Sequence, residues 1–183
     1  VDMDAIKEFK DRALNPEHPV LRGTAQNSDI YFQGREASNK YYDALPDIVA
    51  DYMKEISKIT GREYAPFTYY GAEDADRVIV VMGSATEAIK EAIDYMMERG
   101  EKVGLVSVHL YRPFSVKYLL NVLPKTTKTI AVLDRTKEPG ASCPLYLDVK
   151  NVISSFNSKI KVVGGRYGLA SKNTTPYQIK AVY

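Results

Sequence analysis

"RVIVVMGSATEAIKEAIDYMMERGEKVGLVSVHL", residues 77–110, contains the pattern that decides the fold. An apolar run rich in β-branched residues (77–83) is followed by an amphipathic stretch (84–100) and then by a second apolar run (102–110). The apolar residues of the middle stretch recur with the period of a helix: Ile89, Ala92, Ile93 and Met96. We therefore predict a strand, a covering helix and a second, parallel strand buried in the same sheet.

The same alternation continues to the end of the chain. The runs 128–134 and 159–165 are apolar enough for two more buried strands, and stretches with helical periodicity separate and follow them. Residues typical of helix starts precede the helical stretches: Ser84 with Glu87 as a capping box, Ser115 as a cap, Pro144 in a first turn, and Thr175 with Pro176. The sequence thus predicts an α/β fold with a parallel sheet covered on both faces.

Upstream of this region the pattern is less regular. Residues 2–13 predict a short helix, and residues 15–34 predict a long irregular connection because proline, glycine, Asn and Asp interrupt them. Pro46 is placed to open a second helix, and Gly61 is placed to end it. One apolar stripe is expected along that helix: Ile48, Val49, Tyr52, Met53, Ile56 and Ile59.

The composition restricts the classes of function. A net charge of +2 gives no reason to expect nucleic acid or an acidic membrane as a partner, and no apolar run approaches the length of a membrane span. Cys143 is the single cysteine, so the chain has no disulfide framework and too few thiolates to bind an iron–sulfur cluster alone. His18 and His109 lie far apart in the sequence and predict no metal site. A reducing, cytoplasmic setting fits this composition best.

Charged side chains follow three of the predicted strands at their carboxyl ends, where ligands and partners meet such sheets. They form a candidate rim: Arg112, Asp134, Arg135 and Arg166. Arginine suits bidentate recognition of carboxylate or phosphate and is enriched at interfaces, so the rim is a candidate interface or anion-binding site. Composition leaves open whether Asp134, Glu138, a ligand or another domain compensates these cations. Pro113 disfavours helix at Arg112 and would hold that arginine extended at the edge.

Other chemistry-bearing residues of this edge have structural interpretations. Ser84 lacks a Gly-x-Ser-x-Gly context and fits a helix cap. His109 has no identifiable carboxylate or nucleophile partner in the sequence, so a structural role is favoured. Cys143 lies at a helix start, where a thiol pKa can fall, but no partner base is visible. The residues themselves thus favour structural roles for Ser84 and His109 and give no support for a reactive Cys143.

Several stretches together resemble one known family: "NPEHPVLRGTAQNSDIYFQGREASNKYYDALPDIVADYM" (15–53), "SVHLYRPFS" (107–115), "IAVLDRTKEPG" (130–140) with "PLYLDV" (144–149), and "VVGGRYGLASK" (162–172) before the Thr-Pro-headed helix. In this order, and over nearly the whole chain, they are similar to pyruvate:ferredoxin (flavodoxin) oxidoreductase, also called pyruvate synthase. The resemblance implies the second domain of that enzyme, which is similar to the C-terminal domain of transketolase.

The resemblance also implies an architecture. Residues 66–183 would form a three-layer α/β/α unit with a mostly parallel five-stranded sheet, in which 67–70 is an extra, antiparallel edge strand. Residues 1–65 would be an irregular segment and helices that lead out of the preceding domain.

The function implied by the resemblance belongs to a longer parent enzyme. In that family the whole enzyme converts pyruvate and coenzyme A to acetyl-CoA and CO2 and passes electrons to ferredoxin or flavodoxin. Thiamine diphosphate, magnesium and iron–sulfur clusters are implied as its cofactors, and a homodimer as its assembly. This chain lacks the Gly-Asp-Gly motif of a thiamine diphosphate site and the cysteine runs of the cluster domains. We therefore expect a non-catalytic structural domain that contacts other domains of the same polypeptide, is inactive in isolation and holds no cofactor or metal.

The residues leave two alternative functions open and also single out one polar segment. The chain would instead be an anion-binding or coenzyme A-binding regulatory module if its arginines hold a ligand, or the same domain of an enzyme for another 2-oxoacid. The segment "RGTAQN" (22–27) is a candidate active-site-proximal segment of the intact enzyme, or else a polar connector that satisfies its own backbone. Its candidate residues are Arg22, Thr24, Gln26 and Asn27.

Overall fold

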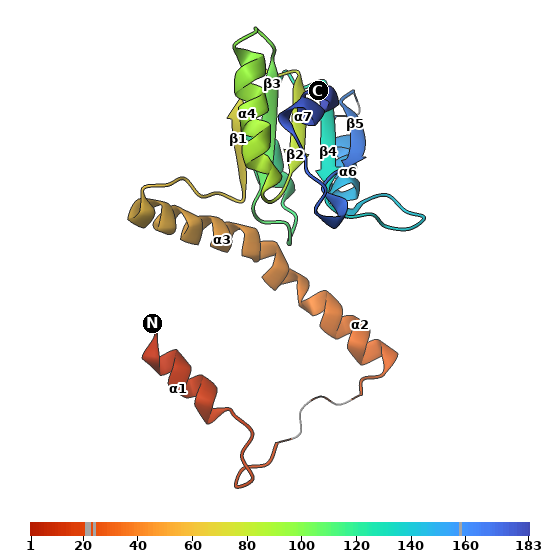
Figure 1. Cartoon of the computed structure of the whole chain (residues 1–183). Coiled ribbons are helices and arrows are strands. Elements are labelled where there is room, and N and C mark those ends of the chain that lie inside the picture. The colour runs from red at the N-terminus through yellow and green to blue at the C-terminus, as the bar shows by residue number, and fades with distance from the viewer. Residues whose placement is uncertain (21–22, 24, 158) are drawn as a thin grey trace. The chain divides into compact units, whose positions relative to one another are not determined.

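The computed structural model describes residues 1–20, 23, 25–157 and 159–183 (Figure 1). The chain divides into two compact units, residues 1–40 and residues 41–183. The first unit contains the helices α1 (Met3–Asp11) and α2 (Ser28–Ala37), and neither helix buries a described residue. The helix predicted for residues 2–13 is confirmed as α1.

The second unit is built around one sheet. The described residues form five strands: β1 (Phe67–Gly71), β2 (Arg77–Val81), β3 (Val103–Val108), β4 (Thr129–Asp134) and β5 (Lys161–Arg166). Their order is β1-β3-β2-β4-β5, and all neighbours are parallel except β1, which runs antiparallel to β3 at one edge. The predicted mostly parallel sheet and its antiparallel edge strand are both confirmed.

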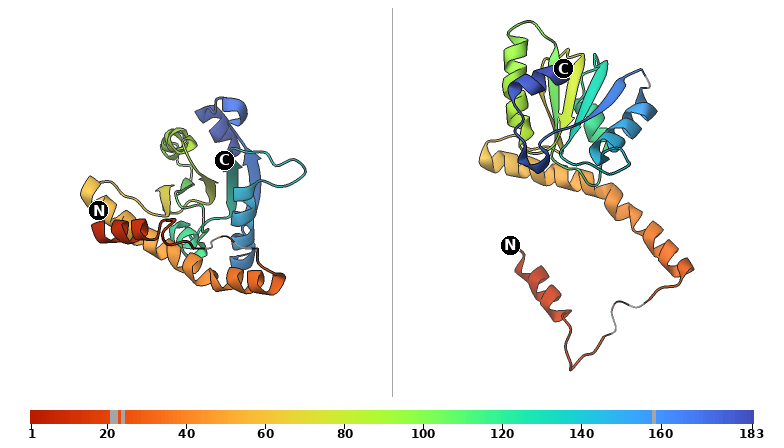
Figure 2. Two further views of the ribbon diagram at one scale, coloured as in Figure 1. Left: turned by 90° about the horizontal axis from the view of Figure 1, so that it is seen from below. Right: turned by 45° about the vertical axis from the view of Figure 1, so that its right-hand side comes forward.

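Helices cover both faces of the sheet. On one face α4 (Ala85–Met97) and α7 (Pro176–Val182) pack against a core that contains Ile79, Leu105 and Ile179. On the other face α5 (Val116–Val122) and α6 (Pro144–Phe156) pack against a core that contains Val80 and Val106. Figure 2 shows the two pairs of helices on opposite sides of the strands. The three-layer α/β/α arrangement is therefore confirmed.

Local side-chain chemistry starts most of these helices as predicted. Ser115 accepts a hydrogen bond from the amide of Tyr118 at the start of α5, and Pro144 occupies the first turn of α6. Thr175 and Gln178 form a full capping box at the start of α7. These three starts are encoded within a few residues of each helix end, which is why the sequence predicts them.

The capping box predicted for Ser84 and Glu87 was wrong. The backbone of Ser84 is already helical (φ −66°, ψ −15°), and within the described chain its side chain forms no capping hydrogen bond. A cap needs extended backbone geometry to bring its oxygen to the free amides. The carboxylate of Glu87 instead pairs with Lys90, at 2.9 Å between Oε1 and Nζ.

The region before the sheet is more helical than predicted. Helix α2 occupies residues 28–37, so the irregular connection predicted for 15–34 ends earlier, where the Asn27 side chain accepts a hydrogen bond from the Ile30 amide and caps α2. Helix α3 (Asn39–Thr60) begins before Pro46, so the prediction that Pro46 opens it was wrong. The residues before Pro46 are compatible with helix and outweigh the start signal of a single proline. Gly61, with φ +69°, ends α3 as predicted.

Within the second unit, the buried residues of α3 are not those of the predicted apolar stripe. Its buried residues are Pro46 and Ala50, and Asp47 accepts hydrogen bonds from Lys117 Nζ at 2.8 Å and from the Tyr118 hydroxyl at 2.7 Å. Most of the predicted apolar stripe is exposed instead: Ile48, Tyr52, Ile56 and Ile59. In the part of the chain that the structure describes, no helix is long and apolar enough to cross a membrane.

Candidate functional site at the carboxyl edge of the sheet

Arg112 lies just after β3 and is held within the second unit. Its Nη2 atom is 2.8 Å from Oδ2 of Asp148 on α6 and donates a hydrogen bond to the Tyr111 hydroxyl at 3.0 Å. The guanidinium also stacks on the Tyr111 ring, 3.9 Å from its centroid. The Oδ2 atom of Asp148 is shielded from solvent, so the guanidinium compensates its charge. Arg112, which precedes Pro113 through a cis peptide bond, therefore ties the turn after β3 to α6.

Asp134 ends β4 and is not an exposed member of the rim. Its side chain is buried, with 2% of the residue exposed. Its two carboxylate oxygens accept hydrogen bonds from the backbone amides of Leu145 (3.0 Å) and Tyr146 (3.1 Å). These amides belong to the first turn of α6, which has no intrahelical acceptor for them. Asp134 thus attaches the start of α6 to the end of β4.

Arg135 serves the turn that follows β5. Its Nε atom donates to the carbonyl oxygen of Gly168 at 3.1 Å. Gly168 has φ +61°, and a Cβ at this position would lie 3.2 Å from the Arg135 Nε atom. The carbonyl that Arg135 holds therefore belongs to a left-handed turn that glycine accommodates best.

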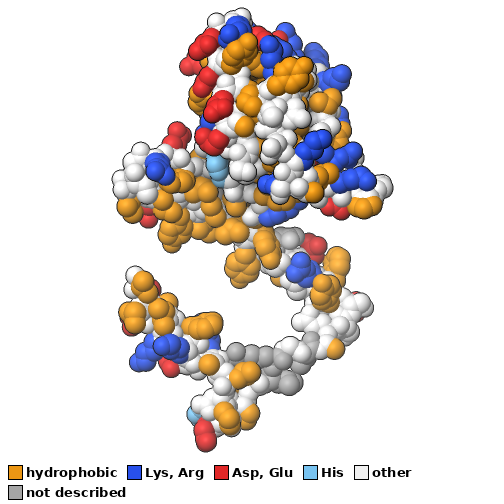
Figure 3. All heavy atoms as spheres, in the orientation of Figure 1, with side chains coloured by type: hydrophobic (Ala, Val, Ile, Leu, Met, Phe, Trp, Pro, Cys, Tyr) orange, Lys and Arg blue, Asp and Glu red, His pale blue; other side chains and the backbone are white. Residues whose placement is uncertain are grey.

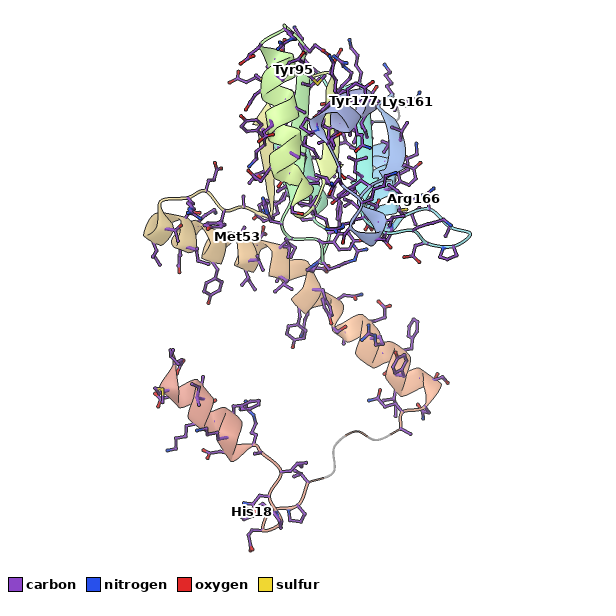
Figure 4. All side chains as sticks on the ribbon, in the orientation of Figure 1. His18, Met53, Tyr95, Lys161, Arg166 and Tyr177 are labelled. Carbon is purple, nitrogen blue, oxygen red and sulfur yellow. The ribbon has the colours of Figure 1, made fainter. Side chains whose placement is uncertain are left out.

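Arg166 differs from the other two arginines. It ends β5 in register with Asp134, and Figure 4 shows it next to the loop between β4 and α6. Among the described residues, its side chain has neither a hydrogen-bond partner nor an ion pair. It lines two cavities, one of about 300 Å³ with Ser142, Cys143 and Tyr146, and one of about 240 Å³ with Lys172 and Gln178. The second cavity therefore has two cationic side chains on its wall.

Tyr167, whose role is not evident from the sequence, lies at the position where such sheets bind ligands. The next strand after β2 in the chain, β3, lies on one side of β2, and the following strand, β4, lies on its other side. The topological switch point of the sheet is therefore between β2 and β4. The Tyr167 hydroxyl donates to the carbonyl oxygen of Met82, which follows β2, at 3.1 Å. Burial raises the pKa of this phenol and keeps it a donor. Tyr167 belongs to the quoted stretch 162–172, but only the strand order shows which position its side chain occupies.

The sequence pattern of a family described as pyruvate:ferredoxin oxidoreductase core domain II matches residues 75–179, which include all the strands except β1. The chain belongs to this family.

Relatives of the family match this chain over its full length. Pyruvate:ferredoxin oxidoreductase of Moorella thermoacetica is 59% identical, and a pyruvate-flavodoxin oxidoreductase of Enterobacter agglomerans is 55% identical, each over 100% of this chain. A pyruvate dehydrogenase [NADP(+)] of Cryptosporidium parvum is 53% identical over 98% of it. The chain spans about 16% of the length of the first two relatives and 10% of the third. Among solved structures, a split-gene transketolase aligns with a TM-score of 0.48 and 20% identity, over 66% of this chain and 41% of that one.

The other candidate residues of this core domain II chain, His109 and Cys143, contact groups of the same chain. The His109 ring lies with Nε2 3.0 Å from the Thr68 hydroxyl on the neighbouring strand, a contact that fits the structural role expected for it. Cys143 is buried, and its Sγ atom lies 3.4 Å from the carbonyl oxygen of Thr136. Within the described ranges, no group of three His, Cys, Asp or Glu side chains is placed to hold a metal ion.

The segment 22–27 lies in the first unit of the core domain II chain. Asn27 caps α2, with its Oδ1 atom 3.0 Å from the Ile30 amide, and Gln26 is exposed. Arg22 and Thr24 lie outside the described residues. Asn27 therefore has a structural role as the N-cap of α2. That this segment lies near an active site in the intact enzyme stays a prediction.

Proposed function

We propose that this chain is a non-catalytic structural domain of a pyruvate:ferredoxin (flavodoxin) oxidoreductase. One observation supports this most strongly: the chain aligns end to end, at 59% identity, with an enzyme of that name while covering 16% of its length. In this proposal the parent converts pyruvate and coenzyme A to acetyl-CoA and CO2, and the electrons pass to ferredoxin or flavodoxin. The domain contributes contacts to neighbouring domains of the same polypeptide.

The electron acceptor is chosen elsewhere in the parent. Relatives named for ferredoxin, flavodoxin and NADP(+) are 59%, 55% and 53% identical to this chain. Such similar domains in enzymes named for different acceptors support a role common to all of them.

The iron–sulfur clusters of the proposed parent have no fitting set of ligands in this chain. An iron–sulfur cluster is held by several cysteine thiolates. This sequence has Cys143 alone, and its thiol is buried against a backbone carbonyl. We propose that the clusters, thiamine diphosphate and magnesium are bound by other parts of a homodimeric, cytoplasmic parent.

The test compares this chain with the intact parent. We expect the isolated chain to give no pyruvate-dependent dye reduction and no thiamine diphosphate binding, while the parent gives both. In the parent, Arg112→Ala and Arg166→Ala should leave kcat unchanged when kcat is calculated per molecule of folded enzyme. Turnover by the isolated chain, or loss of kcat in a fully folded Arg166→Ala parent, would contradict the proposal.

A second candidate function rests on Arg166 alone. It is the rim arginine that lines two cavities without a partner among the described residues, and Lys172 shares one of these cavities. This favours an anion such as phosphate or coenzyme A. Calorimetric titration of the isolated chain with inorganic phosphate and coenzyme A should then give heat that Arg166→Ala removes and Arg112→Lys retains. Equal heats for wild type and Arg166→Ala would eliminate this candidate.

A further inference from the structure

Helix α3 has one broad apolar surface, bounded by a polar sector, and only part of this surface is buried. The face that holds Pro46 and Ala50 is buried. At 100° per residue, the exposed side chains of Ile48, Tyr52, Ile56 and Ile59 gather within one narrow sector on a different side of the helix, and we refer to these four residues as the outer stripe. Asp51, Lys54 and Lys58 form the polar sector, in which Asp51 and Lys54 are paired at 3.0 Å.

The outer stripe is exposed to a degree that is unusual for such large side chains. The exposed fractions are 48% for Ile48, 65% for Tyr52, 47% for Ile56 and 84% for Ile59. Figure 3 shows hydrophobic side chains gathered along this part of the surface. An amphipathic helix with one buried face normally carries charged and polar residues on the rest of its circumference. A contiguous apolar strip on the exposed side marks a contact surface.

The spacing of the outer stripe is that of helix packing. Its members stand at intervals of four, four and three residues, which aligns side chains into the ridge that packs against a second helix or sheet. The stripe has no charge of its own, and the lysines and aspartates of α3 lie outside it. The partner surface is therefore apolar, and an anionic or cationic ligand does not fit it.

The amount of chain outside this structure indicates the partner. The relatives align with the whole chain, yet it covers only 16% of their length, so they are roughly six times as long. The stripe extends over only about 16 Å along the helix axis, at 1.5 Å per residue. A strip of four side chains is too small by itself for a stable contact between two copies of the chain, which needs about 800 Å² on each partner. A contact within one polypeptide does not carry that requirement, because the two surfaces are already joined.

We propose that the outer stripe of α3 is the docking surface for an apolar face of another domain of the same parent polypeptide. This inference rests on the proposed function, because it requires a longer parent. Helix α3 is then a helix buried on two sides, with the sheet domain on one and the neighbouring domain on the other.

Oxidative footprinting of the intact parent tests this directly. Hydroxyl radicals label Tyr52, Ile56 and Ile59 in proportion to their exposure. We expect the labelling to be several-fold slower in the parent than in the isolated chain. The parent carrying Ile56→Asp should show faster labelling of Tyr52 and a lower thermal midpoint. Lys58→Glu, on the polar sector two residues away, is the matched control and should change neither.

The outcomes separate this inference from the proposed function. Equal labelling of the stripe in the parent and in the isolated chain would overturn the inference, even if the isolated chain is inactive as proposed. Slower labelling that disappears when a dimeric parent is diluted to monomers would also overturn it, because a second copy would then be the partner. Slower labelling that persists in the monomeric parent supports it.

Discussion

At the scale of single residues, the polar groups at the carboxyl edge mostly serve the backbone of their own unit. Asp134 binds amides of α6, Arg135 binds the carbonyl of Gly168, and Tyr167 binds the carbonyl of Met82. Each of these side chains satisfies a backbone group at the end of a helix or strand, where regular hydrogen bonding stops. Three members of the candidate interface or anion-binding rim, Arg112, Asp134 and Arg135, thus attach parts of the same unit to one another, whereas Arg166 does not do so among the described residues.

Asp134→Ala tests the most buried of these attachments. The substitution leaves the amides of Leu145 and Tyr146 without their acceptor in a buried site, so we expect a loss of about 1–3 kcal/mol in the free energy of unfolding. Asp134→Asn keeps one carbonyl oxygen and should lose less. Urea unfolding followed by circular dichroism measures both, and an Asp134→Ala variant as stable as wild type would show that the contact contributes nothing.

Gly104→Ala tests a close approach inside the sheet. A Cβ on Gly104 would come within 2.6 Å of the Tyr69 ring carbon Cζ and would collide with its hydroxyl. We expect a loss of about 1–3 kcal/mol from the displaced ring. Gly34→Ala in α2 has open space around the new Cβ and should be neutral or stabilise by about 0.5–1 kcal/mol. Thermal unfolding of both variants against wild type provides the comparison.

Tyr69 also makes stability depend on alkaline pH. Burial, with a smaller effect of Asp74, raises the pKa of its phenol from 10.0 to about 12. The folded state therefore keeps a proton that the unfolded state releases, so the stability contributed by the neutral phenol is complete below pH 10 and falls as the pH rises toward 12. Unfolding measured between these pH values should show a shallower decline for Tyr69→Phe than for wild type. The control is Tyr177→Phe at a position that is 82% exposed, and it should leave the decline unchanged.

At the scale of elements, helix starts differ in how far the sequence predicts them. The Thr175 start is complete within four residues, because the cap and Gln178 exchange hydrogen bonds with each other's backbone. The Ser84 start has chemically similar residues at the same spacing, Ser84 and Glu87, but the backbone of Ser84 is already helical after β2. The connection from β2 to α4 decided that geometry, and residue spacing alone does not describe it.

This difference predicts effects of different size for two similar substitutions. Thr175→Ala should reduce the free energy of unfolding by about 1 kcal/mol, because the cap of α7 and the packing of Ile179 depend on it. Ser84→Ala should change it by less than about 0.5 kcal/mol. Chemical denaturation of the two variants side by side is the measurement. A large loss at Ser84 would show that its hydroxyl has a role other than capping.

At the scale of the whole molecule, apolar side chains are distributed unevenly along the chain. Within the described residues, the buried apolar side chains lie between Phe67 and Ile179, except for Pro46, Ala50 and Pro66. Large exposed ones concentrate before residue 65, among them Phe9, Phe32 and Ile59. The proposed boundary between residues 65 and 66 follows this distribution.

Limited proteolysis tests that boundary. We expect a protease at low concentration to leave a stable product that begins close to residue 65 and unfolds cooperatively, because both core clusters are contained in residues 66–183. Mass spectrometry of the product locates its first residue. A stable product that begins near residue 41, where the second compact unit starts, would instead place α3 inside the domain.

The sequence by itself determined the alternation of strands and helices, the parallel sheet and the starts of α5, α6 and α7. These features depend on periodicity and on contacts a few residues apart, and both can be read along a chain. The family followed from several motifs in the right order. The antiparallel edge strand was predicted from the resemblance and not from the pattern of its own residues.

Only the tertiary structure decided which polar side chains of the carboxyl edge have partners within the described part of the chain. Arg112 meets Asp148 and Asp134 meets the start of α6 through contacts between elements far apart in the chain, so their partners could not be assigned from spacing. The burial of helix α3 could not be predicted from the sequence either. Its sequence specifies an apolar stripe, and the fold shows that the stripe is not buried by the sheet domain. The periodicity of hydrophobic residues identifies an apolar face of a helix, but three-dimensional packing decides which part of the protein buries that face.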